Sequence, residues 1–481
     1  MNKYLKKTKI IATLGPASSK KDVMIDLIKA GVDIFRINFS HADYDLVRKN
    51  VDTIREINKE LGTSVGILGD LQGPKLRVGV VKEGSYLNPG DILTFTNEKI
   101  EGDSRRVYMT YKEFPRDVQV GERILIDDGK LVLQVTETNE LDTVKAVTIQ
   151  GGPLSSKKGV NLPNTNVSLP ALTEKDIEDA NFMLDLELDW IALSFVRHAQ
   201  DIKDLKKLIQ AHPHNKQKTP IIAKIEKPEG VKNIEEILFE CDGLMVARGD
   251  LGVEVPMEEV PAIQKILVEK ARAYSKPVII ATQMMETMIT SLTPTRAEVN
   301  DVANSVLDGA DAVMLSGETS VGKYPVDVVR NMAKIVKNIE STHFYQSKVG
   351  PIEKEFNCID ERFITNRICL AAVRIAGSTD VEAIITLTHS GYTAFQISAH
   401  RPNSNIIVFS DNKRVITMLN LLWGVRAYYY DSSKSTDETI IQVNKMVKEL
   451  GYVEDEDFVI NLNATPAEES GKTNTLRLTK I

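Results

Sequence analysis

The sequence predicts an α/β fold: a (β/α)₈ barrel that is interrupted by an inserted all-β domain and followed by a second α/β domain. Three observations predict it. Eight short β-branched runs alternate with amphipathic, helix-like stretches between residues 8 and 319. Polar side chains follow nearly every run, and a segment of short alternating runs separates the third run from its helix. Continuous apolar strands joined by helices are typical of a parallel sheet that is covered on both faces.

The composition limits the classes of protein to which the chain can belong. At 481 residues it is too long for one ordinary core, so about two to four domains are expected. Because the net charge is −7 and there is no large basic block, no nucleic-acid partner is expected. No apolar run approaches the roughly 20 residues that span a bilayer, so no membrane partner is expected. Three cysteines without paired spacing predict reduced thiols. The basic start is followed at once by a predicted strand and not by the hydrophobic region of a signal peptide, so a cytoplasmic protein is expected.

The eight runs give the predicted barrel strands in order. They lie at 8–15, 32–40, 64–71, 189–196, 220–226, 242–250, 277–284 and 311–319. Alternation alone also fits an open sheet. The carboxyl ends favour a barrel, because barrel enzymes carry their chemistry on that face. The polar residues at or just past those ends are Arg36, Asn38, Asp70, Ser194, Arg197, Lys224, Glu226, Arg248, Asp250, Thr282, Gln283 and Glu318.

The chain divides into three predicted domains. Residues 1–71 and 169–344 form the barrel. Residues 72–168 form the inserted β-domain, in which Asp128-Gly129 between alternating hydrophobic runs predicts a hairpin. Two prolines, Pro163 and Pro170, and an N-cap candidate, Thr173, mark the return to the barrel, so the insert has the position of a lid over the catalytic face. After about residue 345 the pattern restarts, which predicts a separate α/β domain over 345–481.

Two strand exits carry the predicted chemistry. In AKIE, Lys224 and Glu226 are two positions apart and therefore point to the same side of a strand, while ARGD supplies Asp250 from the next strand. Two carboxylates on adjacent strands suit Mg²⁺. Lys224 and Arg36 would complement a phosphate together with a carboxylate. The alternative is a structural network of ion pairs. No Walker A sequence is present, so a phosphate here is not held as in a P-loop.

Several blocks resemble one enzyme family. IIAKIEKPEGV is similar to the active-site signature of pyruvate kinases, and further blocks of that family resemble FRINFSH, MVARGDLGVE, IATQMMETM, PTRAEVNDVANSVLDGADAVMLSGETSVGKYP and SKKGVNLP. The resemblance covers essentially the whole chain. It implies a TIM barrel with a β-rich lid and a C-terminal regulatory domain, usually assembled as a homotetramer. It also implies transfer of the phosphoryl group of phosphoenolpyruvate to ADP, the last step of glycolysis.

The resemblance implies roles for the residues at the strand ends. Arg36 would bind the phosphate of phosphoenolpyruvate. Lys224 would lie beside the transferring phosphoryl group and the enolate oxygen, where a fixed positive charge stabilises the transition state. Glu226 and Asp250 would ligate Mg²⁺, with Mn²⁺ as an alternative ion.

The same resemblance assigns the remaining substrate contacts. The backbone of Gly249 and Asp250, together with the Thr282 hydroxyl, would receive the substrate carboxylate. Thr282 would also belong to the proton relay that converts enolpyruvate into pyruvate. The nucleotide phosphates would be held by His41, Arg77 and Lys158.

Lys75 bears on the need for a monovalent cation. Many pyruvate kinases require K⁺ and carry glutamate where this chain has Lys75. Members without the requirement tend to carry lysine there, and their accompanying residues resemble Leu71, Gln72 and Val78. The Lys75 ammonium is expected to take the place of the ion beside Asp70, so that K⁺ is not required. A surface lysine after a Gly-Pro turn is the alternative. The cation positions implied by the family are Asn38, Ser40, Asp70 and the carbonyl of Leu71.

An effector site is expected in the C-terminal domain. The loop THSGYT at 388–393 and the tail SGKTNTLRL resemble the phosphate-gripping segments of the family's regulatory domain, so a phosphorylated metabolite is the expected effector. An ordinary turn with an N-cap is the alternative. The residues expected to bind the effector are Thr388, Ser390, Gly391 and Thr393.

Two other functions are alternatives to phosphoryl transfer. A metal-dependent aldolase acting on a pyruvate enolate would use the barrel carboxylates but would not need Arg77 or Lys158. A catalytically inactive sensor would have lost a residue of the site, and every residue that maps to the family motifs is present.

Overall fold

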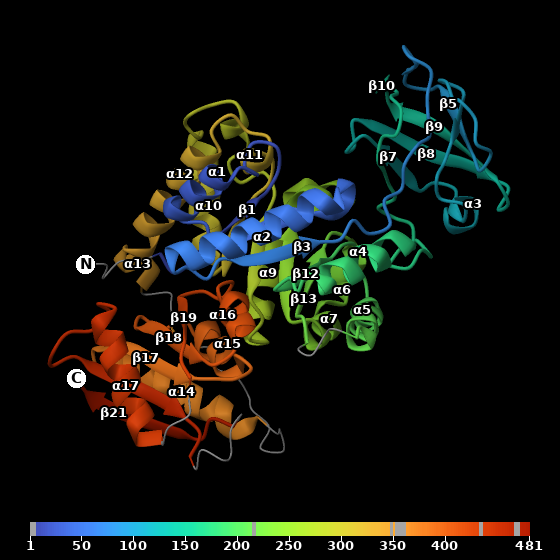
Figure 1. Cartoon of the computed structure of the whole chain (residues 1–481). Coiled ribbons are helices and arrows are strands. Elements are labelled where there is room, and N and C mark those ends of the chain that lie inside the picture. The colour runs from blue at the N-terminus through green and yellow to red at the C-terminus, as the bar shows by residue number, and fades with distance from the viewer. Residues whose placement is uncertain (1–5, 214–217, 347–349, 352–361, 432–435, 466–471) are drawn as a thin grey trace.

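The computed structural model describes residues 6–213, 218–346, 350–351, 362–431, 436–465 and 472–481. Its centre is a closed barrel of parallel strands in the order β1-β16-β15-β14-β13-β12-β3-β2 (Figure 1). Each strand lies within one of the eight predicted runs, so the predicted barrel is confirmed. The strands are β1 (Lys9–Thr13), β2 (Ile34–Asn38), β3 (Gly66–Asp70), β12 (Trp190–Leu193), β13 (Ile221–Ile225), β14 (Gly243–Ala247), β15 (Val278–Ala281) and β16 (Ala312–Leu315).

Helices cover the outside of the barrel because their apolar faces match the outward-pointing side chains of the strands. In α2 (Tyr44–Leu61), Asp43 caps the first turn and Gly62 ends the helix in a left-handed conformation. The other helices of this layer are α1 (Lys21–Ala30), α4 (Glu174–Asp185), α5 (Ala199–Ala211), α6 (Pro228–Lys232), α7 (Ile234–Glu240), α9 (Val260–Ala273), α10 (Arg296–Asp308) and α12 (Pro325–Glu340).

Four aspartates, here called the floor aspartates, organise the amino-terminal end of the barrel. They directly precede β2, β12, β14 and β16, and each accepts a hydrogen bond from an amide at the start of the preceding strand. Every second strand is therefore pinned to its neighbour by a side chain. The floor aspartates are Asp33, Asp189, Asp242 and Asp311, bonded at 2.8, 2.7, 3.0 and 3.0 Å to Ile10, Ile67, Ile221 and Val278.

The inserted segment has its own hydrophobic core and a six-stranded sheet in the order β11-β7-β8-β9-β5-β6. β7 and β8 are antiparallel and are joined through Asp127, Asp128 and Gly129, all with positive φ, which confirms the predicted hairpin. Thr173 caps α4 in a capping box with Asp176, as predicted. The elements are β4 (Tyr86–Leu87), β5 (Ile92–Thr96), β6 (Arg106–Tyr108), α3 (Phe114–Asp117), β7 (Arg123–Ile126), β8 (Leu131–Thr138), β9 (Thr143–Gln150), β10 (Gly152–Pro153) and β11 (Val160–Asn161).

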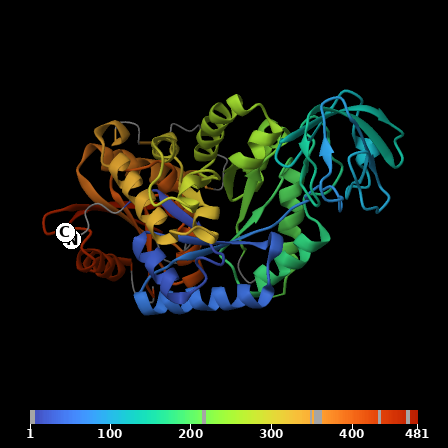
Figure 2. The same cartoon turned by 90° about the horizontal axis from the view of Figure 1, so that it is seen from above.

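The C-terminal sheet has the order β19-β18-β17-β20-β21, and its last strand is antiparallel to β20. Figure 2 shows the barrel between this domain and the insert, which lie at opposite ends of the molecule. The domain boundaries at 72, 168 and 344 stay predictions. The elements are α14 (Phe363–Ser378), β17 (Val381–Leu387), α15 (Tyr392–Ala399), β18 (Asn405–Ser410), α16 (Lys413–Leu419), β19 (Val425–Tyr429), α17 (Thr436–Glu449), β20 (Phe458–Asn463) and β21 (Thr475–Lys480).

Two further expectations concern cysteines and membranes. Cys241 and Cys369 are buried free thiols, and burial raises the pKa of both to about 12, while Cys358 lies outside the described residues. Among the described residues, none of the helices combines the length and the apolar character needed to cross a bilayer.

Candidate active site

Lys224 is the centre of a buried charge cluster at the carboxyl ends of the strands. Its Nζ atom lies 3.1 Å from Asp70 Oδ1 and 3.1 Å from Glu226 Oε1, and it donates a hydrogen bond of 2.6 Å to Ser194 Oγ. Burial alone would lower the pKa of Lys224, but the charges of Asp70 and Glu226 outweigh it and raise that pKa above its ordinary value. Lys224 is therefore a permanent cation whose side chain is largely shielded from solvent.

Arg36 and Asp70 form the second part of the cluster. Arg36 holds Asp70 Oδ2 through Nη2 at 2.6 Å and Nε at 2.7 Å, and its Nη1 donates to Thr13 Oγ1 at 3.1 Å. Asp70 is 1% exposed. Burial would raise the pKa of this carboxyl, but Lys224 and Arg36 hold it below its usual value. Asp70 therefore orients both cations toward the centre of the barrel mouth.

Glu226 and Asp250 supply the oxygen donors that a divalent cation would need. Glu226 is buried, and its Oε2 accepts the Phe195 amide at 2.7 Å. Burial raises the pKa of Glu226 to about 7, Lys224 opposes the shift, and the charge of Asp250 adds to it. A bound cation would relieve this unfavourable interaction of Glu226 with the charge of Asp250. The described residues contain no cluster of three or more protein ligands, as is usual for Mg²⁺ sites completed by water and substrate.

Thr282 follows β15 in the left-handed region, at φ +72°, and Gln283 has φ +54°. A threonine in this conformation is strained and persists only where its surroundings fix it. The hydroxyl of Thr282 accepts the Gly249 amide at 2.7 Å and donates to the Ala281 carbonyl at 2.6 Å. A Cβ at Gly249 would lie 3.3 Å from Thr282 Oγ1, so the close approach favours glycine there.

Arg248 holds the strained backbone at Thr282, just after the end of β15, and the sequence did not reveal that role. Its guanidinium donates to the Thr282 carbonyl at 2.7 Å and to both carboxylate oxygens of Asp301 at 2.6 and 2.8 Å. The predicted strand over 242–250 is too long, because β14 ends at Ala247 and α8 (Arg248–Glu254) begins at once. Asp250 therefore lies in the first turn of a helix.

Comparisons with known proteins agree with this arrangement. Residues 5–329 match the family described as "Pyruvate kinase, barrel domain" and residues 366–479 match "Pyruvate kinase, alpha/beta domain". The chain belongs to the pyruvate kinase family.

It is 41% identical to the pyruvate kinase of Mycobacterium intracellulare over 98% of both chains. It is 43% identical to pyruvate kinase 2 of Synechocystis, over 98% of this chain and 79% of that one. A crystal structure of a Cryptosporidium parvum pyruvate kinase superposes with a TM-score of 0.91 and 35% identity, covering 99% of this chain and 96% of that one. The enzyme is a phosphotransferase of this family.

The structure does not bring Lys75 to Asp70 in this enzyme. Lys75 is exposed on the segment that leads into the insert, after Gly73 at φ +72°, and no ion pair joins it to Asp70 among the described residues. Arg36 and Lys224 neutralise Asp70 instead. At the other implied cation positions, Asn38 Oδ1 accepts the Ser40 amide at 3.2 Å and the Leu71 carbonyl accepts Ser194 Oγ at 2.7 Å.

Two of the predicted nucleotide residues, Arg77 and Lys158, lie on the insert, apart from the cluster around Lys224. Arg77 Nη1 donates to the Lys157 carbonyl at 2.9 Å, and Lys158 Nζ lies 2.9 Å from Asp127 Oδ1. The side chain of His41 lies outside the described residues. A contact that the sequence did not reveal joins insert and barrel: Asn161 Nδ2 and Lys227 Nζ both donate to Glu254 Oε1, at 2.7 and 2.8 Å.

Some of the polar groups in the predicted effector loop, 388–393, form hydrogen bonds within the C-terminal domain. The Gly391 amide donates to Thr388 Oγ1 at 2.9 Å, and Gly391 has φ +85°. Thr393 is buried, and its hydroxyl lies 2.9 Å from that of Thr473. Ser390 is exposed and lines a cavity against the barrel. Ser470 and Gly471 of the predicted tail lie outside the described residues, and 475–478 belong to β21.

Proposed function

We propose that this enzyme transfers the phosphoryl group of phosphoenolpyruvate to ADP and so forms pyruvate and ATP. The observation that carries the proposal is the buried Lys224 ammonium, held between Asp70, Glu226 and Ser194 at the carboxyl ends of the strands. A fixed cation in a site of low dielectric constant stabilises negative charge that develops only in the transition state. The charges of this site are thus oriented before the substrate arrives.

The proposed step exchanges one phosphorus–oxygen bond for another. An oxygen of the ADP β-phosphate bonds to the phosphorus of phosphoenolpyruvate, while the bond from phosphorus to the enol oxygen breaks and leaves its electron pair on that oxygen beside Lys224. Arg36 binds the phosphate before transfer. Carbon 3 of the enolate then takes a proton, which yields pyruvate. The Thr282 hydroxyl belongs to the relay that delivers this proton, and the Gly249 and Asp250 backbone receives the carboxylate.

Glu226 and Asp250 are the proposed residues for Mg²⁺, or for Mn²⁺ in its place. The donor set fits a hard cation, because two carboxylates just past the ends of neighbouring strands leave coordination positions for water and substrate oxygens. When bound, the ion supplies positive charge to the phosphoryl and carboxylate oxygens of the substrate. Lys158, Arg77 and His41 are the proposed nucleotide contacts once the insert closes over the barrel as a lid.

The proposal extends to regulation and assembly. A phosphorylated metabolite acts through the loop that contains Thr388, Ser390, Gly391 and Thr393. The enzyme works as a cytoplasmic homotetramer at the last step of glycolysis. When the insert closes over the barrel, Lys75, on the segment that joins the two, approaches Asp70 and supplies the monovalent charge, so K⁺ is not required. Family resemblance supports these properties, and the exposure of Ser390 supports the regulatory site.

The test is a coupled assay that measures ATP and pyruvate separately. We expect both products in equal amounts, only when phosphoenolpyruvate, ADP and a divalent cation are all present. An aldolase would release pyruvate without ADP, from a substrate whose carbon–carbon bond is cleaved. Pyruvate formation that does not depend on ADP would contradict the proposal.

A further inference from the structure

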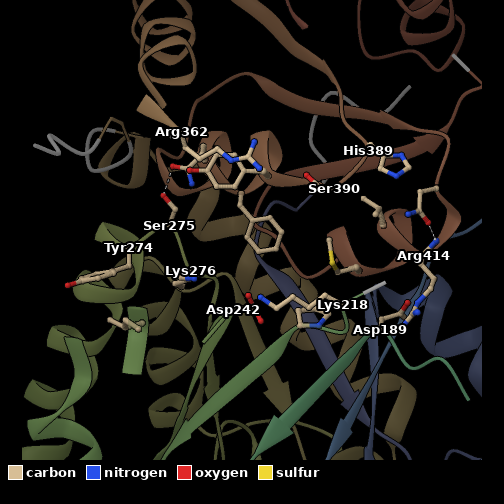
Figure 3. Close-up of a pocket in the computed structure, with 18 of the residues that line it drawn as sticks. Asp189, Lys218, Asp242, Tyr274, Ser275, Lys276, Arg362, His389, Ser390 and Arg414 are labelled. Carbon is tan, nitrogen blue, oxygen red and sulfur yellow. Dashed lines mark hydrogen bonds between the residues drawn. The ribbon is translucent and has the colours of Figure 1, made fainter. Parts of the chain in front are cut away.

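Two residues just past the end of β12, Ser194 and Phe195, lie between the catalytic charges and the chain segment that leads out to the insert. This outgoing segment begins at Leu71, directly after β3, and continues through Gly73. The two residues are at the carboxyl ends of the barrel strands. The cavity of about 720 Å³ that is lined by Ser390 of the predicted effector loop is at the opposite end of the barrel (Figure 3).

The Ser194 hydroxyl joins the outgoing segment to Lys224. It donates a hydrogen bond of 2.7 Å to the Leu71 carbonyl and accepts one of 2.6 Å from Lys224 Nζ. Because a hydroxyl has a single proton, its bond to the carbonyl leaves only lone pairs for the ammonium group. Ser194 is 1% exposed, so bulk water does not compete for either bond. The position of the Leu71 carbonyl therefore determines where Ser194 holds the Lys224 ammonium.

Phe195 joins the same segment to Glu226. Its amide donates to Glu226 Oε2 at 2.7 Å, and its φ of +54° is strained for a bulky side chain. Such a conformation persists only where the surroundings fix it. Gly73 is part of these surroundings, since a Cβ there would lie 2.8 Å from the Phe195 ring and 2.9 Å from Ser194 Cβ. The outgoing segment thus packs directly on the two residues that hold Lys224 and Glu226.

These contacts connect the insert to the active site. Arg77 and Lys158, on the insert, lie apart from the cluster around Lys224, so the insert has to move before a nucleotide can react there. A movement of the insert acts first on the outgoing segment, on which Ser194 and Phe195 rest. Close-packed contacts transmit such a shift, because they have few voids into which side chains could yield.

We propose that Ser194 and Phe195 are positioning residues that couple the insert to Lys224 and Glu226. Nucleotide binding moves the insert, the outgoing segment shifts, and the two residues bring the ammonium and the carboxylate into the positions used in phosphoryl transfer. Such a coupling is reciprocal, so a ligand beside Lys224 also favours binding of the nucleotide. The inference rests on the proposed function, because the two ligands are those of that reaction.

Calorimetric titration with oxalate measures this coupling without turnover. Oxalate is a planar dianion, as the pyruvate enolate is, and it has no phosphoryl group to transfer. It is titrated in the presence of Mg²⁺, with and without saturating ADP. In the unmodified enzyme we expect oxalate to bind at least about fivefold more tightly when ADP is present. Equal affinity under the two conditions would overturn the proposal.

Ser194→Ala removes the connection between the Leu71 carbonyl and Lys224. If Ser194 only supported the fold, its loss would weaken oxalate binding by the same factor with and without ADP. A loss of coupling instead reduces the ratio of the two affinities, which we expect to fall below about twofold. An unchanged ratio in this variant would overturn the role of Ser194.

Thr319→Val is the matched control for Ser194→Ala. Thr319 is also a fully buried hydroxyl that donates to a backbone carbonyl, that of Thr13 at 2.9 Å. Among the described residues, no hydrogen bond joins Thr319 to the outgoing segment. Its replacement should leave the ratio of the two oxalate affinities unchanged, and a loss of the ratio equal to that in Ser194→Ala would contradict the proposal.

Gly73→Ala tests the packing contact and keeps the proposal falsifiable if Ser194→Ala fails to fold. The new Cβ would displace Ser194 and Phe195, so the ratio should again fall. Gly84→Ala is the control, since Gly84 has φ +78°, close to the +72° of Gly73, and a Cβ there would meet no atom within 4 Å. Both variants carry similar backbone strain, so equal ratios in the two would contradict the proposal.

The failure of this inference and the failure of the proposed function give different results. Positive coupling between oxalate and ADP in a chain that forms no ATP would contradict the proposed function alone. ATP formation by the unmodified enzyme, together with an unchanged ratio in Ser194→Ala and Gly73→Ala, would contradict this inference alone.

Discussion

At the residue scale, the charge of Lys224 is the feature most directly tied to catalysis. Lys224→Met keeps most of the volume and removes the ammonium between Asp70 and Glu226. We expect the activation barrier for ATP formation to rise by at least ~3 kcal/mol, as when one donor to a developing oxyanion is lost. The measurement is kcat at saturating substrates, with the melting temperature as a check on folding.

Lys227→Met is the matched control for that variant. Lys227 is also buried, and its replacement also removes an ion pair with a carboxylate, that of Glu254. It lies outside the cluster around Lys224. Its kcat should fall much less. If both variants lost activity equally, the loss would reflect general destabilisation, and the assignment of Lys224 would fail.

Asp189 is a second residue with a measurable electrostatic signature. Burial raises the pKa of this floor aspartate to about 6, although Thr417 and the Ile67 amide donate to it. The folded chain binds this proton more tightly than the unfolded chain, so the stability that the group contributes is present below about pH 4 and is lost as the pH rises through 6. Above that range, the ionised carboxylate costs on the order of 2–3 kcal/mol.

Asp189→Asn should therefore stabilise the protein at pH 7.5 more than at pH 5. The asparagine oxygen accepts the Ile67 amide, and the NH₂ group donates to the Thr417 hydroxyl. Melting temperatures at the two pH values test this. Asp311→Asn, at the equivalent position, should destabilise at both, because it weakens the ion pair with Arg401. A melting temperature for Asp189→Asn that falls equally at both pH values would contradict the role of burial.

At the scale of elements, the contact between α8 and the end of β15 sets the shape of the substrate site. Arg248→Lys removes the planar guanidinium that binds both Asp301 and the Thr282 carbonyl. We expect KM for phosphoenolpyruvate to rise about tenfold, since a hydrogen bond to a charged group contributes roughly 1.5–3 kcal/mol. Hydrogen exchange at 281–284 should become faster. Arg330→Lys, in an exposed ion pair with Asp327, is the control and should leave KM unchanged.

The elements that the sequence predicts well are those whose signal is local. Each buried barrel strand is a short β-branched run, and Thr173 and Asp128-Gly129 are recognisable in a few residues. The predicted end of β14, at residue 250, was wrong. The change from strand to helix at Arg248 is fixed by contacts with Thr282 and Asp301, which lie far along the chain. β21 was not predicted as a strand because it is largely exposed and pairs only with β20.

The sequence predicted which residues form the charge cluster at the active site, but it did not predict which of them contact one another. Lys224 and Asp70 lie on strands that are separated by β12, so their ion pair depends on the order and curvature of these three neighbouring strands. Ser194, just past the end of β12, connects Lys224 to the Leu71 carbonyl. No spacing along the chain encodes such a contact.

At the scale of the whole molecule, Lys75 lies on the connection between barrel and lid, so its role depends on how these parts approach one another. We expect full activity in buffer free of Na⁺ and K⁺, with a tetraalkylammonium counterion. An ammonium group ~4 Å from Asp70 would contribute about 4 kcal/mol at an effective dielectric constant of ~20. Initial rates with and without K⁺ are the measurement.

Lys75→Glu should be nearly inactive without K⁺ and should regain activity when K⁺ is added. Lys82→Glu, at an exposed lysine of the insert, should behave as the unmodified enzyme does. Strong activation of the unmodified enzyme by K⁺ would overturn the proposed role of Lys75. The sequence could not place this side chain, because the position of the lid is fixed by contacts such as Asn161 to Glu254 rather than by local pattern.

The two chain segments that join the barrel to the insert meet at one point. The Gly73 amide, on the outgoing segment, donates to Asp176 Oδ1 at 3.0 Å, and Asp176 belongs to the first turn of the helix that follows the return. Apart from side-chain contacts such as that of Asn161 with Glu254, which rotation of the lid would change, this junction is where the insert is attached to the barrel. A body attached in this way can rotate about the junction but can translate very little. Lid motion in this enzyme therefore has few degrees of freedom, and nucleotide bound to the insert would travel along an arc toward the phosphoryl donor rather than search for it by diffusion.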